Sequence, residues 1–310
     1  MPCFSPIKAW MVPPVKPGGK ALIEFPSKND SSFTRALKSV IHRNPNAVLI
    51  DLPCGKCIGC RLERSRQWAV RAVKESQCHL DNCFITLTYD PEHLPKNGSL
   101  NPEDLTKFIK RFRQRIAPAK IKYIAVGEYG DKTSRPHYHL LVFGYNFKDL
   151  KKVSVKNAET GVLSVRRHSE SLFDLWKLGL VSCDKVTFES CAYVARYNLK
   201  KVNGKKAADY YGDRIPEFLH CSNGIGRTWY ESYGYTDTRA TDSILINGIE
   251  SKLPRYFDKL HEEMDPVSYF EMKNKRREML AEKSPEELAE DARNKYRVLM
   301  SRQKKRRNRL

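Results

Sequence analysis

Two histidines one residue apart are the first side chains in this sequence that point to metal chemistry. His137 and His139 flank Tyr138 in the run RPHYHLLVFG, which has the composition of a β-strand. Because side chains alternate between the faces of a strand, both imidazoles are expected on one face and Tyr138 on the other. Glu128 precedes His137 by nine residues on a second predicted strand, and a tight turn would bring it beside the imidazoles. Two imidazoles and one carboxylate predict a site for Mg²⁺ or Mn²⁺ that polarises a phosphodiester.

Tyr193, Tyr197 and Lys201 form a second group, at positions i, i+4 and i+8 of a helix predicted over 190–202. The helical repeat predicts that the three side chains rise along one stripe. A tyrosine oxygen can attack phosphorus and conserve the phosphodiester energy in a covalent bond, with help from a nearby cation. We assign both tyrosines as candidate nucleophiles and Lys201 as their cationic partner. Each pattern alone also fits ordinary structure, because such histidines are often partly buried and such tyrosines often pack in a core.

Cys54, Cys57 and Cys60 form a C-x2-C-x2-C cluster in the run PCGKCIGCR. Thiolates at this spacing in a reducing compartment suit Zn²⁺ or an iron–sulfur centre. The cluster is therefore a candidate structural Zn²⁺ site, and the alternative is three reduced thiols in a glycine-rich turn. Spacing leaves the fourth ligand open, with Cys78, His79 and Cys83 as candidates.

The elements that must position these groups lie in the middle of the chain. Three β-rich runs alternate with polar turns, and Asn101 followed by Pro102 predicts the start of a basic amphipathic helix. The fold class is therefore α+β, with a central antiparallel sheet and flanking helices, expected on one side. The predicted strands cover 83–89, 120–130 and 137–144.

The composition predicts a polyanionic partner, since 56 Lys and Arg against 36 Asp and Glu leave a formal net charge of +20. No apolar run is long enough to span a membrane and the first residues lack a secretory pattern, so a reduced, cytosolic protein is expected. A non-catalytic single-strand-binding protein is the alternative that also fits the charge and the 15 Tyr and 13 Phe. It does not account for the acid, the histidine pair and the tyrosines occurring together. Phosphate contacts are expected from Arg61, Arg64, Arg66, Arg71 and the tail Arg302–Leu310.

The runs FITLTY, VGEYG…RPHYHLLVFG and YVARYNLKK resemble, in order and spacing, the motifs of the HUH superfamily of rolling-circle replication initiators. In this resemblance His137 and His139 form the paired-histidine motif, Glu128 is the acidic third ligand, and the tyrosines with Lys201 match the two-tyrosine branch. With the run PCGKCIGCRLERSRQWAVR, the chain is most similar to replication-associated proteins of gokushovirus-type microviruses, the single-stranded DNA phages that include those of chlamydiae. Conjugative relaxases usually place the tyrosine before the histidines, so the order here favours an initiator.

The resemblance implies the HUH endonuclease fold and a metal-dependent endodeoxyribonuclease and strand transferase. One tyrosine would attack a phosphate at the viral DNA origin, leaving a 5′-phosphotyrosine and a free 3′-OH for a host DNA polymerase. The second tyrosine would later release the displaced strand as a circle. The sequence has no P-loop, so unwinding is expected from a host helicase, in the bacterial cytoplasm. A metal nuclease that uses water would cut DNA without a covalent adduct and is a further alternative.

These observations divide the chain into four segments. An irregular N-terminal arm is expected over 1–53, and the cysteine cluster with a basic helix over 54–80. The segment 81–202 is the expected HUH endonuclease core. The segment 203–310 is an accessory region that becomes helical and basic toward its end.

Overall fold

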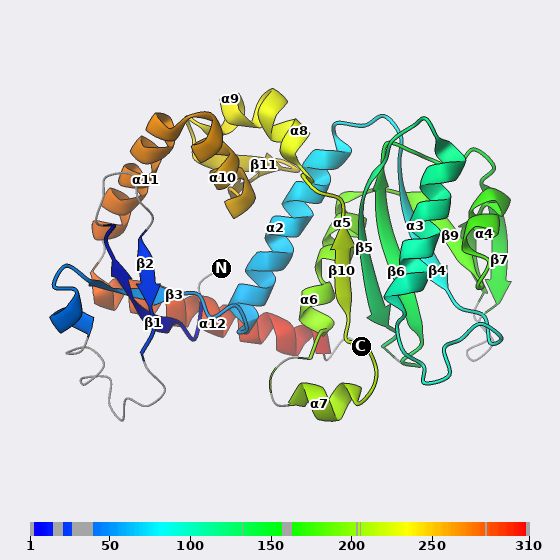
Figure 1. Cartoon of the computed structure of the whole chain (residues 1–310), viewed down its shortest axis with the longest axis horizontal. Helices are drawn as coiled ribbons and strands as arrows, with labels where there is room; N and C mark the ends of the chain where they lie inside the picture. Colours follow the sequence, from blue (N-terminus) through cyan, green and yellow to red (C-terminus); the bar gives the residue numbers. More distant parts are fainter. Residues whose placement is uncertain are drawn as a thin grey trace. The chain divides into compact units, whose positions relative to one another are not determined.

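Five antiparallel strands form the central sheet of the computed structural model, in the order β10-β5-β6-β4-β9 (Figure 1). The structure describes residues 3–14, 21–26, 40–131, 133–156, 163–202, 204, 206–282 and 284–307. Among these residues, no helix combines the length and the apolar character that crossing a membrane requires. The strands of the central sheet are β4 (Asn82–Thr88), β5 (Lys122–Tyr129), β6 (Pro136–Phe143), β9 (Val181–Lys185) and β10 (Phe218–Cys221).

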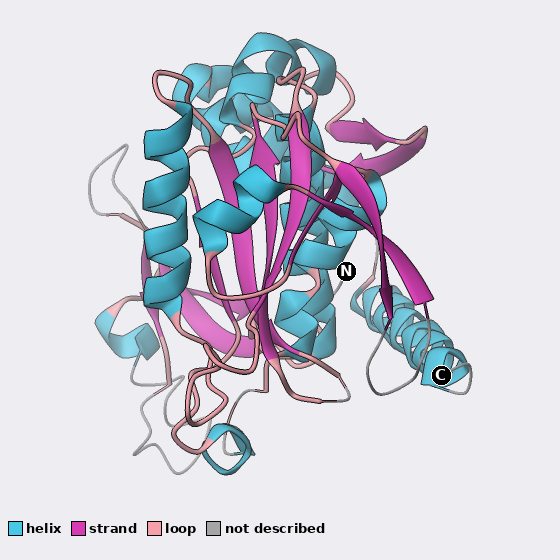
Figure 2. Ribbon diagram, turned by 90° about the vertical axis from the view of Figure 1, so that its right-hand side faces the viewer, coloured by secondary structure: helices cyan, strands magenta, loops and turns pink. Residues whose placement is uncertain are grey.

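Helices cover both faces of this sheet (Figure 2). Alternate residues of β6 point to opposite faces, so Leu140 packs with α3 and α4 whereas Leu141 packs with α2 and α5. The expectation of helices on one side only is wrong, because β5 and β6 are apolar and buried on both faces and both faces need cover. The covering helices are α2 (Ile58–Ser76), α3 (Pro102–Ile116), α4 (Glu170–Trp176) and α5 (Phe188–Ala195).

Helix α3 begins as its sequence predicts. The Asn101 side chain accepts a hydrogen bond from the backbone N–H of Glu103, and Pro102 occupies the first turn, where a missing N–H costs nothing. Apolar residues at helical spacing then point into the core, while the basic residues face outward. The buried residues of α3 are Leu105, Phe108, Ile109, Phe112 and Ile116.

Two compact units divide the chain. The sheet unit is Arg64–Lys283, and the terminal unit combines Met1–Glu63 with Ser284–Leu310. In the sheet unit, the edge strand β10 comes from the segment 203–310, and a second small core surrounds the buried Phe257. The remaining elements of this unit are β7 (Lys151–Lys156), β8 (Leu163–His168), α6 (Tyr197–Lys200), α7 (Lys206–Tyr211), α8 (Arg227–Trp229), the π-helical turn η1 (Tyr230–Gly234), α9 (Tyr235–Thr238), β11 (Ser243–Ile246), β12 (Ile249–Lys252), α10 (Arg255–Met264) and α11 (Pro266–Ala281).

The terminal unit contains a three-stranded antiparallel sheet of order β2-β1-β3 and the helix α12 (Pro285–Arg307). The expectation of an irregular N-terminal arm is therefore wrong for the described part of that segment. The strands are short, and β1 pairs with β3 across a long interval of sequence, so the local hydrophobic pattern does not predict this sheet. The helical C-terminal end is confirmed. The three strands are β1 (Ile7–Val12), β2 (Leu22–Glu24) and β3 (Val48–Leu52).

Candidate active site

The hairpin of β5 and β6 brings the predicted acid to the predicted histidines. Its register places Glu128 directly opposite His137 and Val126 opposite His139. A short turn after Gly130 closes the hairpin, where the N–H of Gly130 donates to the carbonyl of Arg135. Residues that pair directly across a sheet share one face, so the carboxylate and both imidazoles point the same way. The expected juxtaposition is present.

Glu128, His137 and His139, here called the histidine site, each offer a ligand atom within 4.8 Å of the others. The Glu128 side chain is 1% exposed and that of His139 is 7% exposed. Oxygen and neutral imidazole nitrogen suit Mg²⁺ or Mn²⁺, and three protein ligands leave positions on an octahedral ion for substrate oxygens. The donor set therefore fits the metal that the sequence predicts.

Hydrogen bonds orient both imidazoles toward this shared point. His137 Nδ1 lies 3.1 Å from the Arg135 carbonyl, and His139 Nδ1 lies 3.0 Å from Thr86 Oγ1. A proton held on each Nδ1 leaves each Nε2 with a lone pair for a metal. Burial lowers the pKa of His137, and burial together with the nearby His137 and Lys200 lowers the pKa of His139 to about 3. Both rings are therefore neutral near pH 7, as metal ligands must be.

Tyr138 anchors the same strand from the other face of the sheet. Its ring is fully buried, and its hydroxyl donates to the carbonyl of Asn101 while accepting from the Asn101 N–H at 2.8 Å. The Tyr89 hydroxyl lies 2.8 Å from the Tyr138 hydroxyl oxygen. Because Asn101 is also the cap of α3, the bulky residue between the histidines ties β6 to that helix. This contact holds the strand that carries both histidines in place.

Tyr193 reaches the histidine site from helix α5. Thr187 and Ser190 form a reciprocal capping box, and the helix begins at Phe188, two residues before the predicted start. The Tyr193 hydroxyl lies 3.3 Å from His139 Nε2, and the two rings meet edge to face. Phe84 of β4 packs against both rings. Burial, and then the negative charge of Glu128, raise the pKa of the Tyr193 hydroxyl, so the phenol is protonated until a cation assists it.

Tyr197 does not continue the helix that carries Tyr193. The predicted single helix is interrupted at Arg196, whose N–H donates to the carbonyl of Tyr193, three residues back. Tyr197 then opens the short helix α6 and packs, partly buried, against the same core cluster as Tyr193. A tightened turn of this kind gives the two tyrosines different surroundings. Tyr193 therefore lies beside His139 on α5, while Tyr197 begins a separate helix.

Lys200 is a residue of the site that the sequence patterns do not single out. Its Nζ lies 2.9 Å from Glu128 Oε2 and 3.3 Å from Asp131 Oδ1. Burial alone would lower the pKa of Lys200, but the bond and charge of Glu128 raise it above its ordinary value. In an uninterrupted helix, two turns contain about 7.2 residues, so the residue seven positions after Tyr193 would return to its face. That spacing was the signal available for Lys200. Lys201 follows α6, and its N–H donates to the carbonyl of Tyr197.

Two of the arginines expected on phosphates, Arg66 and Arg71, make contacts within the sheet unit. The Arg66 guanidinium donates to Ser251 Oγ and to the Lys252 carbonyl, at 2.9 Å and 2.6 Å. Arg71 donates to the Ile225 carbonyl and stacks on Trp68 and Tyr256. These hydrogen bonds and ring contacts hold the accessory segment to α2.

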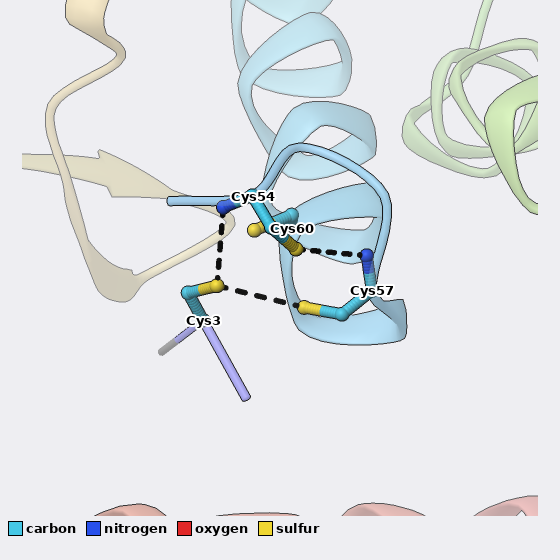
Figure 3. Close-up of side chains that lie close together, drawn as sticks. All are labelled: Cys3, Cys54, Cys57 and Cys60. Carbon is cyan, nitrogen blue, oxygen red and sulfur yellow. Dashed lines mark hydrogen bonds between the residues drawn. The ribbon is translucent and has the colours of Figure 1, made fainter. Parts of the chain in front are cut away.

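The three predicted cysteines come together in the terminal unit, with Cys3 as the fourth member (Figure 3). The candidates Cys78, His79 and Cys83 for the fourth ligand are wrong. Cys83 is fully buried in the central sheet, and His79 pairs with Glu75 at 2.8 Å. Cys3 was not recognised because it lies 51 residues before Cys54, and only the pairing of strands brings it close.

Comparison with known proteins finds one family model and several relatives of this chain. The family model for replication-associated protein ORF2/G2P matches residues 82–202, which contain the histidine site and both tyrosines. The replication-associated protein VP4 of Bdellovibrio phage phiMH2K is 37% identical over 228 residues, covering 71% of this chain and 70% of that protein. For the replication-associated protein ORF2 of Spiroplasma virus 4, the identity is 37% over 258 residues and the coverage is 78% of each chain.

A third relative extends the same pattern. The replication-associated protein ORF4 of Chlamydia phage 1 is 36% identical over 213 residues, which cover 67% of this chain and 53% of that protein. No solved structure matches the chain significantly. With two relatives matched over more than two thirds of their length at this identity, this chain belongs to the family of microvirus replication-associated proteins.

Proposed function

We propose that the chain is a rolling-circle replication initiator that nicks and rejoins viral origin DNA through a tyrosine. The observation that carries this proposal is the Tyr193 hydroxyl 3.3 Å from His139 Nε2, in a group of three residues that could hold a metal ion. A nucleophile belongs next to the group that polarises its target, because attack requires both at one phosphorus. The family membership supports a role in replicating phage DNA.

The reaction that fits these residues is a transesterification. The Tyr193 oxygen forms a bond to phosphorus, the bond between phosphorus and the 3′ oxygen breaks, and that oxygen takes up the proton released by the phenol. The products are a 5′-phosphotyrosine and a free 3′-OH, with one phosphodiester exchanged for another. The bond energy is conserved, so the reverse step rejoins DNA without a nucleotide cofactor.

Glu128, His137 and His139 would hold Mg²⁺ or Mn²⁺, and such an ion supplies charge that polarises the scissile phosphate. The fold contributes the rest by positioning. The Nδ1 hydrogen bonds aim the imidazoles, Tyr138 fixes their strand, and α5 presents the phenol. Lys200 lies beside both Glu128 and the Tyr193 ring, where its ammonium would favour the phenolate during attack. From the sequence, Lys201 is a second candidate for that cation.

Tyr197 supplies the second nucleophile in this proposal. Initiation occupies one tyrosine with DNA, and termination requires another to cleave the regenerated junction while the first is still bonded. The released 3′-OH then attacks the held phosphotyrosine and closes a single-stranded circle. The net charge of +20 suits the viral DNA strand as partner. A host helicase and a host DNA polymerase would open the duplex and extend the 3′-OH.

A covalent adduct is the direct test of this function. Single-stranded oligonucleotides that tile the viral genome are incubated with the protein and Mn²⁺, then separated on a denaturing gel. An oligonucleotide labelled at its 3′ end should give a protein-linked band, because the tyrosine keeps the 5′ phosphate. The same oligonucleotide labelled at its 5′ end should give a shorter free product.

The Tyr193→Phe/Tyr197→Phe double variant should form no adduct, since it loses only the two hydroxyls. Tyr233→Phe is the matched control, because Tyr233 is 59% exposed and lies outside the site. Cleavage without an adduct would instead support a metal nuclease that uses water. Binding without any cleavage of the tiled genome would support a single-strand-binding protein.

A further inference from the structure

Four sulfur atoms from two distant parts of the sequence converge in the terminal unit. Cys3, Cys54, Cys57 and Cys60, here called the cysteine site, each place Sγ within 4.8 Å of the others (Figure 3). The Sγ atoms of Cys3 and Cys57 lie 3.9 Å apart. None of the four is in a disulfide, and all are partly buried. The rolling-circle chemistry proposed above uses none of them.

The terminal sheet explains how Cys3 reaches the other three cysteines. Strands β1 and β3 pair antiparallel, with Ile7 opposite Leu52. The residues just before β1 and just after β3 therefore leave the sheet at the same end. Cys3 lies four residues before the first of these partners, and Cys54 lies two residues after the second. The strand register thus fixes the meeting of the two segments.

The turn that carries the other three cysteines is shaped to direct sulfur atoms inward. Gly55 has φ of 72°, a left-handed conformation that other residues adopt with strain, and it reverses the chain between Cys54 and Cys57. The Arg61 N–H then donates to the Cys57 carbonyl at 3.0 Å, which begins α2 at this turn. Cys60 follows on the first turn of the helix and faces the same point as the loop cysteines.

Backbone N–H groups surround the sulfur atoms. The Cys54 N–H donates to Cys3 Sγ at 3.3 Å, the Phe4 N–H to Cys57 Sγ at 3.4 Å, and the Cys57 N–H to Cys54 Sγ at 3.3 Å. Donors aimed at sulfur stabilise the thiolate form, which is the form that binds metal. The cysteines therefore have the outer contacts of a metal centre as well as its ligands.

We propose that the cysteine site is a closed, tetrahedral Zn²⁺ centre whose fourth ligand is Cys3. With a Zn–S distance of about 2.3 Å, tetrahedral geometry separates the sulfurs by about 3.8 Å. The 3.9 Å between the Cys3 and Cys57 sulfurs matches that value. An iron–sulfur cluster needs wider spacing between those of its cysteines that bind different iron atoms, since inorganic sulfide lies between the irons, whereas all four sulfurs here lie within 4.8 Å of one another. Four protein ligands leave no position for substrate, so the role is structural.

The terminal sheet is small enough to need such support. Its buried cluster, among the described residues, consists of Trp10 and Val40 with Ala47 packed against them. A core of this size buries too little apolar surface to offset the entropy of ordering the chain. A metal that joins Cys3 to Cys54 closes a loop that spans most of this segment. We assign the Zn²⁺ to holding the N-terminal sheet together at the start of α2.

Metal content of the full-length chain tests this assignment. Protein purified in reductant should contain one zinc per chain by elemental mass spectrometry, without added metal. Cys3→Ser should lose that zinc or bind it at least about 100-fold more weakly in competition with a chromophoric chelator, because a ligand contributes more than the outer contacts do. Cys78→Ser is the matched control, since Cys78 is also partly buried and should keep full zinc. His139→Ala should also keep it, which separates this zinc from the histidine site.

A second measurement uses only the wild-type protein and holds if Cys3→Ser fails to fold. Replacement by Co²⁺ should give the intense visible bands of tetrahedral thiolate coordination. Alkylation followed by peptide mass spectrometry should find the four thiols protected with metal and reactive after its removal. Iron with acid-labile sulfide, a metal-free protein with four reactive thiols, or full zinc affinity in Cys3→Ser would each overturn the proposal. The failure of rolling-circle chemistry would leave it unaffected, because zinc content is measured without DNA.

Discussion

The histidine site and the cysteine site differ in ligands and in what holds those ligands. The first offers one oxygen and two nitrogens from the middle of a five-stranded sheet, and the second offers four sulfurs beside three short strands. Three hard or borderline ligands leave an ion open to substrate, whereas four thiolates close it. A tyrosine hydroxyl lies against the histidine site, whereas backbone N–H groups and neighbouring thiols contact the sulfur atoms of the cysteine site.

This difference indicates that the fold positions the ligands at the histidine site, whereas at the cysteine site the metal would position the fold. The central sheet has an extensive buried core on both faces, so it positions the histidine site before any ion binds. The described part of the terminal sheet has a much smaller buried core, so its metal would position the strands. Loss of the first ion should therefore abolish chemistry and spare structure. Loss of the metal at the cysteine site should disrupt the terminal sheet and spare the chemistry.

His139→Ala should produce the largest effect on chemistry. We expect DNA cleavage to fall by about 10³-fold or more, because polarisation of the phosphate is worth several kcal/mol. Single-strand binding should remain, since basic residues hold the backbone independently. Initial cleavage rates and filter binding measure the two effects, with the exposed His93→Ala as control. Chelator should have the same effect on the wild type, and Mn²⁺ or Mg²⁺ should restore it. Full cleavage in chelator would contradict the metal assignment.

Lys200→Met and Lys201→Met should separate the two candidate cations. Lys200 bonds to the buried Glu128, so Lys200→Met leaves the Glu128 carboxylate without this partner. Loss of a hydrogen bond to a charged group corresponds to about 10- to 100-fold in the cleavage rate. We expect that loss for Lys200→Met and a change within about threefold for Lys201→Met. Single-turnover rates at saturating Mn²⁺ provide the measurement. A larger rate loss in Lys201→Met than in Lys200→Met would instead identify Lys201, the residue favoured by the family pattern, as the cation that assists the tyrosine.

Truncation after Met300 should change binding rather than chemistry. The removed residues include six basic side chains, and each phosphate contact contributes about 0.7 to the slope of log affinity against log salt for a single strand. We expect the slope to decrease by up to about 4 while cleavage of short oligonucleotides is preserved. Titrations at several salt concentrations measure it. An unchanged slope would mean that this end of the chain does not contact DNA.

Cys3→Ser should produce the smallest effect on catalysis. All residues of the histidine site belong to the sheet unit, so cleavage of short oligonucleotides should stay within about threefold of wild type. Limited proteolysis should meanwhile cut the variant faster within residues 1–63 and leave 64–283 resistant. Mapping the first cut sites by mass spectrometry checks both expectations. A variant that loses cleavage in step with its zinc would show that the two metals are not independent.

The sequence predicts the histidine site well because its parts are local. Glu128 and His137 lie on consecutive strands joined by a short turn, so alternation and loop length settle their pairing. Strand β10 and Cys3 were missed because they reach their partners across long stretches of chain. Lys200 was missed for another reason, since exact positions near the interrupted helix at Arg196 depend on tertiary packing. Long-range pairing and helix ends were therefore the limits of prediction.

The identity of the DNA-linked residue tests the central claim most directly. Trypsin cleaves after Lys185, Arg196 and Lys200, so it places Tyr193 and Tyr197 on separate peptides. After one turnover on an origin oligonucleotide with Mn²⁺ and nuclease digestion, mass spectrometry should find the nucleotide on the peptide that contains Tyr193, the tyrosine beside His139. Attachment first at Tyr197 would contradict the proposed order. Attachment at neither tyrosine, or cleavage without any linked peptide, would contradict the mechanism itself.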